Sequence, residues 1–480
     1  MRALVERCCT DGYAAEPMQR RTSRRRRPLA VLFALAALAS AVACGAPPEP
    51  RVRTVLFAVD GLEWRVLLPL LAAGRLPTLE GLMARGSYGS LTTIHPTWSP
   101  VIWTSIATGR PASEHGITDF ERSGPGGAPL LFRSGDRRTK AFWNIWSDHG
   151  RRVDVVGWWL TYPVEPIDGV MVAQTNTTTR AELVKNAGIR KGELVAGRAG
   201  QVHPKEREAE IFAIAEEVRA RLPALRQQAF GAAAETTDPQ AASLFEASVW
   251  ALRADAIYAE VARRLAREDA ELLAVYFGGT DVVGHRFWRY REPERYADRP
   301  SPEAVAQLGG VIADYHVFID RCMGEILAAL PSEARVIVVS DHGMEASNVA
   351  RRFPPEARGA ALISGNHLRG PPGVFVAAGP GIPGPGRQLP GSASELPAVG
   401  SVLDVLPTLL ALSALPQGLD MPGRPLPSAL APGVLANVPA PVPSHDSPEW
   451  LRERARLAEL PPPTEDAERV RQLRELGYIE

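Results

Sequence analysis

The sequence predicts an α/β protein whose mostly parallel sheet is covered on both faces by helices, with a helical insertion along the chain. Two observations carry this prediction. Short runs rich in β-branched residues, typical of buried strands, alternate with segments that have helical periodicity. Apolar residues make up 45% of the 480 residues and charged residues 22%, which is enough for one large packed core. Alternating strands and helices favour parallel pairing, because each crossover helix covers a face of the sheet.

The individual elements follow from apolar runs and from the residues that bound them. Six predicted strands are Val52–Val59, Ser87–Thr93, Val153–Trp159, Glu271–Phe277, Arg335–Ser340 and Gly373–Ala378. Predicted helices start at Thr78 and span Ser99–Thr108, Ile211–Leu225, Ala241–Leu265, Pro302–Leu330 and Leu403–Leu412. Gly109 and Pro111 should stop the helix that begins at Ser99.

The composition changes along the chain and predicts its organisation. Residues 1–44 have the layout of a secretion signal, residues 45–50 form a Pro-rich linker, and residues 51–427 form the α/β domain. Residues 181–267 are rich in Ala, Glu and Arg and are predicted to be a helical cap inserted in that domain. Residues 428–480 form a Pro-rich tail that ends in a charged helical segment from Glu449 to Tyr478.

The first residues predict export. An Arg cluster between Arg20 and Arg27 precedes the apolar run Leu29–Ala43, as in a secretory signal. Cys44 follows Ala41-Val42-Ala43, which resembles a bacterial lipoprotein cleavage site, so Cys44 is a candidate for lipidation. Ordinary cleavage nearby, or retention of the apolar run as a membrane anchor near the lower limit of about 17 residues, are the alternatives. We expect a periplasmic or cell-surface protein.

The overall charge argues against one class of partner. The chain carries 54 basic and 54 acidic residues, a formal net charge of zero. Nucleic-acid binding depends largely on an excess of basic residues that neutralise phosphates. No nucleic-acid partner is therefore expected.

Polar residues cluster at or near the ends of predicted strands. Asp60 follows the first strand, Asp281 and His285 follow Glu271–Phe277, and Asp341 and His342 follow Arg335–Ser340. His367 instead precedes its strand. In open α/β sheets the carboxyl edge is where sites assemble, although a single Asp there is often only a turn or a helix cap. Together the three Asp and three His predict ligands for two divalent cations that accept nitrogen and oxygen donors, such as zinc.

Ser99 is the candidate nucleophile. Pro96 and Pro100 bracket it, and a predicted helix starts there, so free N–H groups and the positive end of the helix dipole would favour a phosphate. A serine hydroxyl is a poor nucleophile until a base or a metal activates it. A plain helix cap is the alternative role for Ser99, and Thr97 is the rival nucleophile.

These residues resemble the type I phosphodiesterase/nucleotide pyrophosphatase family of the alkaline phosphatase superfamily, over about residues 52–427. The resemblance is carried by Val59-Asp60-Gly61, Pro96-Thr97-Trp98-Ser99-Pro100, Trp103-Thr104-Ser105, Thr108-Gly109, His115-Gly116-Ile117, Asp281-Val282-Val283-Gly284-His285, Ser340-Asp341-His342-Gly343 and Gly365-Asn366-His367. Val402 to Thr408 and Met421 to Leu426 resemble the closing helix and strand of the group.

The resemblance implies a three-layer αβα alkaline-phosphatase-like fold and a phosphoesterase that works through a phospho-serine intermediate. It implies one metal held by Asp281, His285 and His367, and a second held by Asp60, Asp341, His342 and Ser99. Zinc is the expected metal, with manganese as the alternative. The expected substrate is a small-molecule or lipid phosphate ester, and membrane attachment would come from Cys44 or the apolar run.

Two departures from the family narrow the expected substrate. Where nucleotide-type enzymes carry Asn three positions after the nucleophile, this chain has Ile102, which removes a phosphate donor. Trp98 stands where a sulfatase would need Cys or Ser, which argues against a sulfatase. The positions after Ser99 are apolar and favour a diester. A phosphomonoesterase or head-group phosphotransferase using the same site, and a non-catalytic surface lipoprotein of this fold, remain as alternatives.

Overall fold

The computed structural model describes residues 52–124, 129–174, 194, 199–347, 363–384 and 389–458. The predicted signal, Cys44 and the linker lie outside these residues, as do most of residues 175–198 and the end of the predicted C-terminal helix. The described residues belong to one compact unit that begins at Val52.

A nine-stranded sheet forms the centre of this unit, with strand order β13-β2-β12-β9-β1-β8-β5-β6-β7. The middle of the sheet is parallel: β1 (Thr54–Val59) lies between β9 (Arg335–Val339) and β8 (Leu272–Phe277). The strand β5 (Val153–Val156) continues the parallel set beside β8, followed by β6 (Met171–Val172). Every residue of β1 and β8 is buried, as expected for strands covered on both faces.

The outer strands break the parallel pattern. β12 (Gly373–Ala378) is antiparallel to both β9 and β2 (Gly86–Thr92). β13 (Ala398–Ser401) pairs in parallel with β2, and the short β7 (Val202–His203) is antiparallel to β6. The sheet is therefore mixed but mainly parallel, which confirms the predicted fold class.

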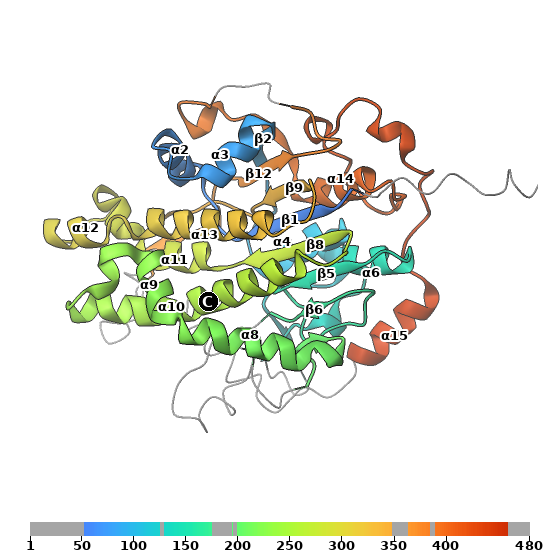
Figure 1. Ribbon diagram of the computed structural model, residues 1–480, viewed down its shortest axis with the longest axis horizontal. Coiled ribbons are helices and arrows are strands. Elements are labelled where there is room, and N and C mark those ends of the chain that lie inside the picture. The colour runs from blue at the N-terminus through green and yellow to red at the C-terminus, as the bar shows by residue number, and fades with distance from the viewer. Residues whose placement is uncertain are drawn as a thin grey trace, which may run out of the picture. The chain divides into compact units, whose positions relative to one another are not determined.

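Helices flank the sheet (Figure 1). One layer contains α2 (Trp64–Ala72), α3 (Pro77–Ala84), α8 (Glu208–Ala220), α9 (Leu222–Phe230), α10 (Pro239–Leu265), α11 (Gly279–Arg291) and α13 (Val311–Ala328), which pack on one another in sequence-distant pairs. A second group contains α4 (Ser99–Thr108), α6 (Phe142–Asp148) and α14 (Val405–Leu412). Buried apolar side chains from both groups and from the sheet form one continuous core.

The helices of the predicted cap region take part in this covering layer. α10 packs against β8, α11 and α13, and Figure 1 shows it lying beside α11 and α8. Its carboxyl half is largely buried, which fits a helix that covers a sheet. The cap boundary at residue 181 lies outside the described residues.

Three predicted elements differ from those observed. The helix expected over Ile211–Leu225 is divided at Arg221 into α8 and α9. The helix expected over Pro302–Leu330 is split into α12 (Pro302–Leu308) and α13, because Gly309 and Gly310 interrupt it. A Cβ on Gly309 would stand 2.7 Å from the carbonyl oxygen of Val305, so the chain is tight at this break. The strand expected over Val153–Trp159 ends at Val156, because Gly157 adopts a positive φ of 74° and turns the chain.

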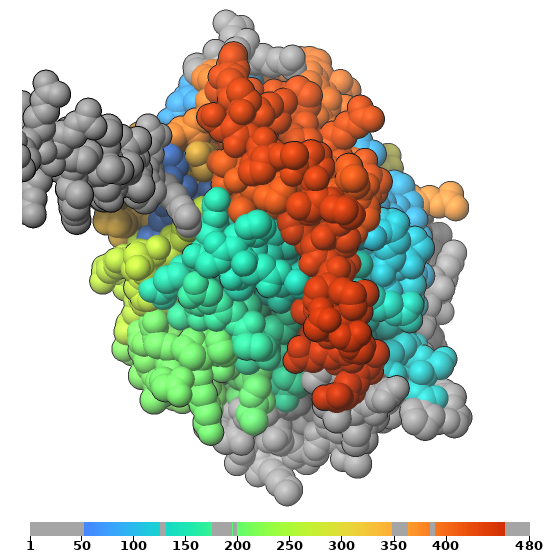
Figure 2. All heavy atoms as spheres, turned by 90° about the vertical axis from the view of Figure 1, so that its right-hand side faces the viewer, coloured from blue at the N-terminus to red at the C-terminus, as the bar shows by residue number. Residues whose placement is uncertain are grey.

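The tail after Leu426 runs over the surface of the unit. It contains two short 3-10 turns, Pro427–Ala429 and Val434–Asn437, and the helix α15 (Pro448–Ala458). Figure 2 shows this segment, coloured orange-red, as a band across one face of the unit. No single helix among the described residues has both the length and the apolar composition to span a membrane. Taken together, α2 and α3 have that length and composition, but the pair is bent by 91°.

Candidate functional site

Most of the predicted site residues lie just after the carboxyl ends of three adjacent strands at the centre of the sheet. Asp60 follows β1 directly, Asp341 and His342 follow β9, and Asp281 and His285 lie in α11, which begins just after β8. Because these strands are parallel neighbours, their carboxyl ends meet at one edge of the sheet. All five side chains are at least 95% buried.

His367 reaches the same place by a different route. A two-stranded ribbon joins β10 (Glu345–Ala346) to β11 (Gly365–Asn366), and His367 follows β11 immediately. The rings of His367 and His342 stack with centroids 3.8 Å apart. The ribbon therefore brings the sixth predicted residue onto the cluster formed by the strand ends.

Five of the six side chains form two overlapping groups that share His342, and His285 adjoins the second group through Asp281. Ligand atoms of Asp60, Asp341 and His342 lie within 4.8 Å of one another, as do those of Asp281, His342 and His367. In the first group, Nε2 of His342 lies 3.4 Å from Asp60 Oδ1 and 3.2 Å from Asp341 Oδ2. In the second, Asp281 Oδ1 lies 3.3 Å from Nε2 of His285 and 3.5 Å from Nε2 of His367.

Neighbouring groups fix how these side chains point. The outer oxygen of Asp60, Oδ2, accepts hydrogen bonds from Tyr276 Oη at 2.6 Å and Trp103 Nε1 at 3.0 Å. Nδ1 of His285 lies 2.9 Å from the carbonyl oxygen of Gly365. A histidine whose Nδ1 is occupied in this way presents Nε2 to a ligand. The arrangement aims Oδ1 of Asp60 and Nε2 of His285 into the cluster.

The electrostatics of the cluster favour a bound cation. Burial, with Asp281 nearby, raises the pKa of Asp60 to about 7, and burial with Asp60 nearby raises the pKa of Asp341 well above its usual value. Burial lowers the pKa of His342 to about 3 and that of His367 well below its usual value. Asp281 and His285 behave differently, because each stabilises the charged form of the other: despite burial, His285 lowers the pKa of Asp281, and Asp281 raises the pKa of His285. The crowded Asp60 and Asp341 beside the neutral imidazoles of His342 and His367 form an environment that a divalent cation would stabilise.

Unpaired polar atoms test whether the residues fit a metal. Among the described residues, Asp60 Oδ1, Asp281 Oδ1, Asp341 Oδ2 and His342 Nε2 are buried and have no hydrogen-bond partner. Buried polar atoms are rarely left unsatisfied unless a ligand, ion or water meets them. With three carboxylates and three imidazoles converging, the donor set suits divalent cations such as zinc or manganese.

Ser99 and Thr97 have different surroundings. Thr97 donates its hydroxyl to the backbone carbonyl of His367, and its oxygen lies 3.2 Å from Nδ1 of the same residue. The Ser99 hydroxyl is buried and has no hydrogen-bond partner among the described residues. Ser99 stands at the first position of α4, between Thr97, which contacts His367, and Trp103, which contacts Asp60. Of the two hydroxyls, Ser99 is therefore the one left available.

Several supporting residues were not singled out from the sequence. Tyr276 and Trp103 hold Asp60, Glu63 accepts a hydrogen bond from the backbone N–H of Met344 at 2.9 Å, and Asp255 accepts from the start of α11. Because each contact joins residues far apart in the chain, no local sequence pattern predicts it. Asp255 is, with Glu260, one of two acidic residues among the buried and mostly apolar positions of α10, which is a weak sequence signal.

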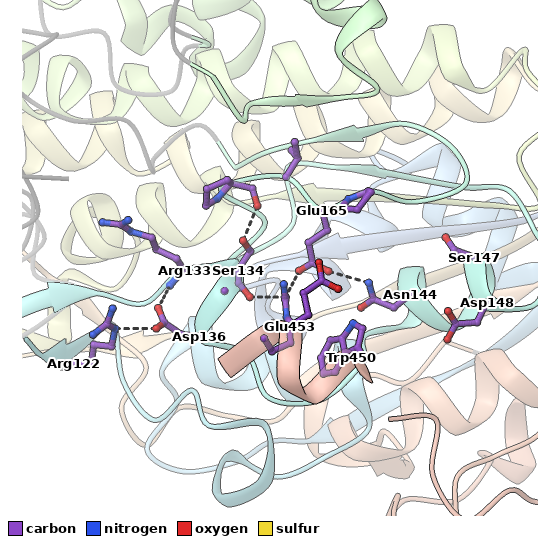
Figure 3. Close-up of a pocket in the computed structure, with 15 residues that line it drawn as sticks. Arg122, Arg133, Ser134, Asp136, Asn144, Ser147, Asp148, Glu165, Trp450 and Glu453 are labelled. Atoms are coloured by element: carbon purple, nitrogen blue, oxygen red, sulfur yellow. Dashed lines mark hydrogen bonds and ion pairs between the residues drawn. The ribbon is translucent and has the colours of Figure 1, made fainter. Parts of the chain in front are cut away.

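A separate cavity of about 370 Å³ lies under the C-terminal helix α15 (Figure 3). Its walls come from Arg122, residues within 133–148, residues 163–166 and α15. On its floor, Nη2 of Arg454 donates to Glu165 Oε1 at 2.5 Å and to the Ser134 carbonyl at 2.6 Å. Its polar side chains largely pair with one another, as Figure 3 shows for Arg122 and Asp136 and for Asn144 and Glu165. We interpret this cavity as part of the contact between α15 and the α/β domain.

Comparison with known proteins agrees with this geometry. The family model described as type I phosphodiesterase / nucleotide pyrophosphatase matches residues 54–355, which is more than half of the chain. The match includes five of the six clustered residues and Ser99, and it ends before His367. No curated protein matches the chain.

The solved structures that match the chain do so at low identity and low TM-score. Phosphonoacetate hydrolase from Sinorhizobium meliloti 1021, in complex with phosphonoformate, is 18% identical with a TM-score of 0.37, over 65% of this chain and 59% of that chain. The chain thus spans under two thirds of that enzyme. Human ectonucleotide pyrophosphatase / phosphodiesterase 5 is 13% identical with a TM-score of 0.43, over 78% of this chain and 97% of that chain. On the strength of the family match, the chain belongs to the type I phosphodiesterase / nucleotide pyrophosphatase family of phosphoric-ester hydrolases.

Proposed function

We propose that the chain is an exported, metal-dependent phosphodiesterase that hydrolyses a small-molecule or lipid phosphate ester, with Ser99 as nucleophile and two divalent cations as cofactors. One observation carries the proposal. The unpaired buried atoms of Asp60, Asp281, Asp341 and His342 converge, while the free hydroxyl of Ser99 stands at the start of the helix that also contacts Asp60. The family match supports the same reaction class.

The six ligands divide naturally between the two cations. Asp281, His285 and His367 would hold one, since both imidazoles approach Asp281 Oδ1. Asp60, Asp341 and His342 would hold the other together with Ser99, since both carboxylates approach His342 Nε2. When bound, such cations lower the pKa of a coordinated hydroxyl and neutralise charge on a phosphate. Mixed nitrogen and oxygen donors favour zinc, with manganese as the alternative.

The chain's own residues then supply the nucleophile and its surroundings. The Ser99 oxygen loses its proton and attacks phosphorus, and the bond to one ester oxygen breaks, so that one alcohol leaves with a proton. The phosphoryl group, which still carries the second ester arm, remains on Ser99. Water then attacks this phosphorus, its oxygen stays on the phosphate monoester that is released, and a proton returns to the Ser99 hydroxyl. The first turn of α4 offers its positive dipole end to the phosphate oxygens throughout.

The surroundings of Ser99 favour a diester over a monoester. A monoester carries one more charged oxygen, which normally needs a cationic partner. Residues Pro100 to Trp103 are apolar, and the sequence has no Lys or Arg between Ser99 and Arg110. Ile102, which stands where nucleotide-type enzymes carry Asn, is fully buried in the core. That position therefore packs the helix, which argues against a nucleotide as the preferred substrate.

Export rests on sequence features outside the described residues. The Arg cluster before Leu29–Ala43 and the small residues before Cys44 support a cleaved signal with lipidation of Cys44. Periplasmic or cell-surface placement would present the site to phosphate esters outside the cytoplasm. Labelling of the expressed full chain with a radioactive fatty acid, with Cys44→Ser as control, tests this part independently of activity.

The activity is tested by metal analysis and turnover of two model esters. We expect two bound ions per chain and faster hydrolysis of bis-p-nitrophenyl phosphate than of p-nitrophenyl phosphate. Ser99→Ala should lower kcat by about 10³-fold or more while binding both ions. Thr97→Ala, the matched control, should still form the phosphorylated intermediate. Faster monoester turnover would replace the diesterase with a phosphomonoesterase, and a chain without bound metal or hydrolysis would contradict the proposal.

A further inference from the structure

Asp255 is a buried carboxylate that is none of the predicted metal ligands. It lies in α10 and is 1% exposed. Its Oδ1 accepts a hydrogen bond from the backbone N–H of Gly278, and its Oδ2 accepts one from that of Gly279, both at 2.9 Å. The hydroxyl of Tyr315 donates to Oδ2, also at 2.9 Å. Three donors from two other elements thus converge on this single side chain.

These contacts place Asp255 at the N-terminus of α11. The residue before that helix, Gly278, has no side chain, so α11 cannot supply its own capping group. A carboxylate at this end satisfies free N–H groups and meets the positive end of the helix dipole. Gly279 keeps the approach open, because a Cβ there would stand 2.5 Å from Asp255 Oδ2. Asp255 therefore caps α11 from a neighbouring helix.

The helix that Asp255 caps carries two site residues. Asp281 is in its first turn, and His285 lies one turn further on the same face, with Nε2 3.3 Å from Asp281 Oδ1. The helix start is also close to the turn that follows β1: a Cβ on Gly61 would lie 3.0 Å from the Asp281 Cα. The start of α11 therefore contacts both Asp255 and the residues just after β1. A small shift of this start would move Asp281 and His285 together.

We infer that Asp255 is a positioning residue for the cation site formed by Asp281, His285 and His367. Burying a carboxylate is costly, and burial raises the pKa of Asp255 to about 7. The three hydrogen bonds offset part of that cost only while the start of α11 keeps its place. Because this inference rests on the proposed metal-dependent function, its test has to separate the two.

The fold offers a matched control for the alternative that Asp255 merely stabilises the protein. Asp320, also 1% exposed, accepts from the backbone N–H groups of Thr78 at 3.0 Å and Leu79 at 2.8 Å. It therefore caps α3 from α13, just as Asp255 caps α11 from α10. α3 carries none of the clustered site residues, so loss of the Asp320 cap should affect stability alone.

The experiment compares the full chain with Asp255→Asn, Asp320→Asn and Tyr315→Phe. Each protein is stripped with a chelator and titrated with Zn²⁺ and Mn²⁺, and bound ions per chain and thermal midpoints are measured. In Asp255→Asn, the NH₂ group of the new side chain would point at the backbone N–H of Gly278 or of Gly279, so that two donors would face each other and that hydrogen bond would be lost. We expect one ion to bind about 10–100-fold more weakly and the other as in the wild type. Asp320→Asn should lower the midpoint of the metal-free protein but bind both ions normally.

Tyr315→Phe keeps the carboxylate and removes one donor, so it tests the inference even if Asp255→Asn fails to fold. We expect a several-fold weakening of one ion only. The inference is overturned if Asp255→Asn and Tyr315→Phe, or whichever of them folds, bind both ions with wild-type affinity. Equal weakening in Asp320→Asn would show a general stability effect and would also overturn it. A wild-type chain that binds no ion would refute the proposed function itself.

Discussion

Two buried acidic clusters in this protein are neutralised in different ways. Under α15, Glu165 accepts from Nη2 of Arg137 at 2.7 and 2.8 Å and from Arg454 at 2.5 Å. At the strand ends, Asp60 and Asp341 lie beside the imidazole of His342, and Asp281 lies beside those of His285 and His367, with Arg286 also acting to lower its pKa. Arginine side chains hydrogen-bond to Glu165, whereas the groups in contact with the three strand-end carboxylates are imidazoles. The difference indicates that the second cluster is built for an external cation.

The pKa values express the same contrast. Burial alone would raise the pKa of Glu165, but Arg137 and Arg454 outweigh it and lower the pKa to about 2. Burial and a neighbouring carboxylate instead raise the pKa of Asp60 to about 7. The first cluster is neutralised by its own arginines, whereas we expect Asp60 and Asp341 in the second to destabilise the metal-free protein.

The largest expected effect comes from removing the charge of Glu165. Glu165→Gln would leave Arg137 and Arg454 buried without their anion, and breaking such a pair typically costs about 3–5 kcal/mol. We expect that loss in the free energy of unfolding, measured by urea denaturation, with two ions still bound. The matched change at the other cluster, Asp341→Asn, should raise the stability of the metal-free protein while it weakens metal binding. If both Glu165→Gln and Asp341→Asn destabilised the metal-free protein, the proposed difference between the two acidic clusters would be contradicted.

Acid should weaken the Glu165 cluster over a defined pH range. Because the folded pKa of about 2 lies below the unfolded value of about 4.5, the contribution of Glu165 is complete above pH 4.5 and is lost as the pH falls toward 2. The difference of about 2.5 units corresponds to about 3 kcal/mol. The stability gap between wild type and Glu165→Gln should therefore narrow below pH 4.5, as measured by denaturant unfolding from pH 6 to 3.5. A gap that stays constant would contradict the assigned pairing.

These contrasts also show how far the sequence alone could go. Apolar β-strands that end in Asp predicted the parallel centre of the sheet and placed Asp60, Asp281 and Asp341 at one edge, because both signals are local. The ribbon that carries His367 was not predicted, since β10 and β11 are only two residues long each. The break at Gly309 was visible in the sequence but was overridden by helical periodicity on both sides.

The supporting contacts could not be predicted, because they join distant parts of the chain. Glu165 and Arg454 are 289 residues apart, and Asp255 and Gly278 are 23 residues apart on different elements. An acidic residue in a helix or a loop is usually solvated, and nothing near it in the sequence marks it as buried. The tail was predicted as a Pro-rich segment with a charged helical end, and the buried Arg454 shows where that end is attached.

Removal and return of metal should change stability in the second cluster only. A ligand that binds only the folded state at 100 times its dissociation constant adds about 2.7 kcal/mol per site. We expect the thermal midpoint of the chelator-treated chain to rise when Zn²⁺ or Mn²⁺ is added, and the increment to be the same in Glu165→Gln. If metal stabilised the wild type but not Glu165→Gln, the two clusters would be coupled and the contrast between them would fail.

The smallest expected effect lies in the contact that orients Asp60. Tyr276 donates to Asp60 Oδ2 at 2.6 Å and itself accepts from Trp159 Nε1 at 2.8 Å. Tyr276→Phe removes the hydroxyl but keeps the ring, so Asp60 would lose one of the two donors that hold it. Because outer hydrogen bonds to metal ligands typically contribute about 10-fold or more in affinity, we expect about 10-fold weaker binding of one ion in a Zn²⁺ titration. Trp159→Phe, the control, leaves the Tyr276 hydroxyl on Asp60 and should bind both ions nearly as the wild type does. Equal effects of the two variants would mean that the aromatic packing, and not the hydrogen bond to Asp60, sets the affinity.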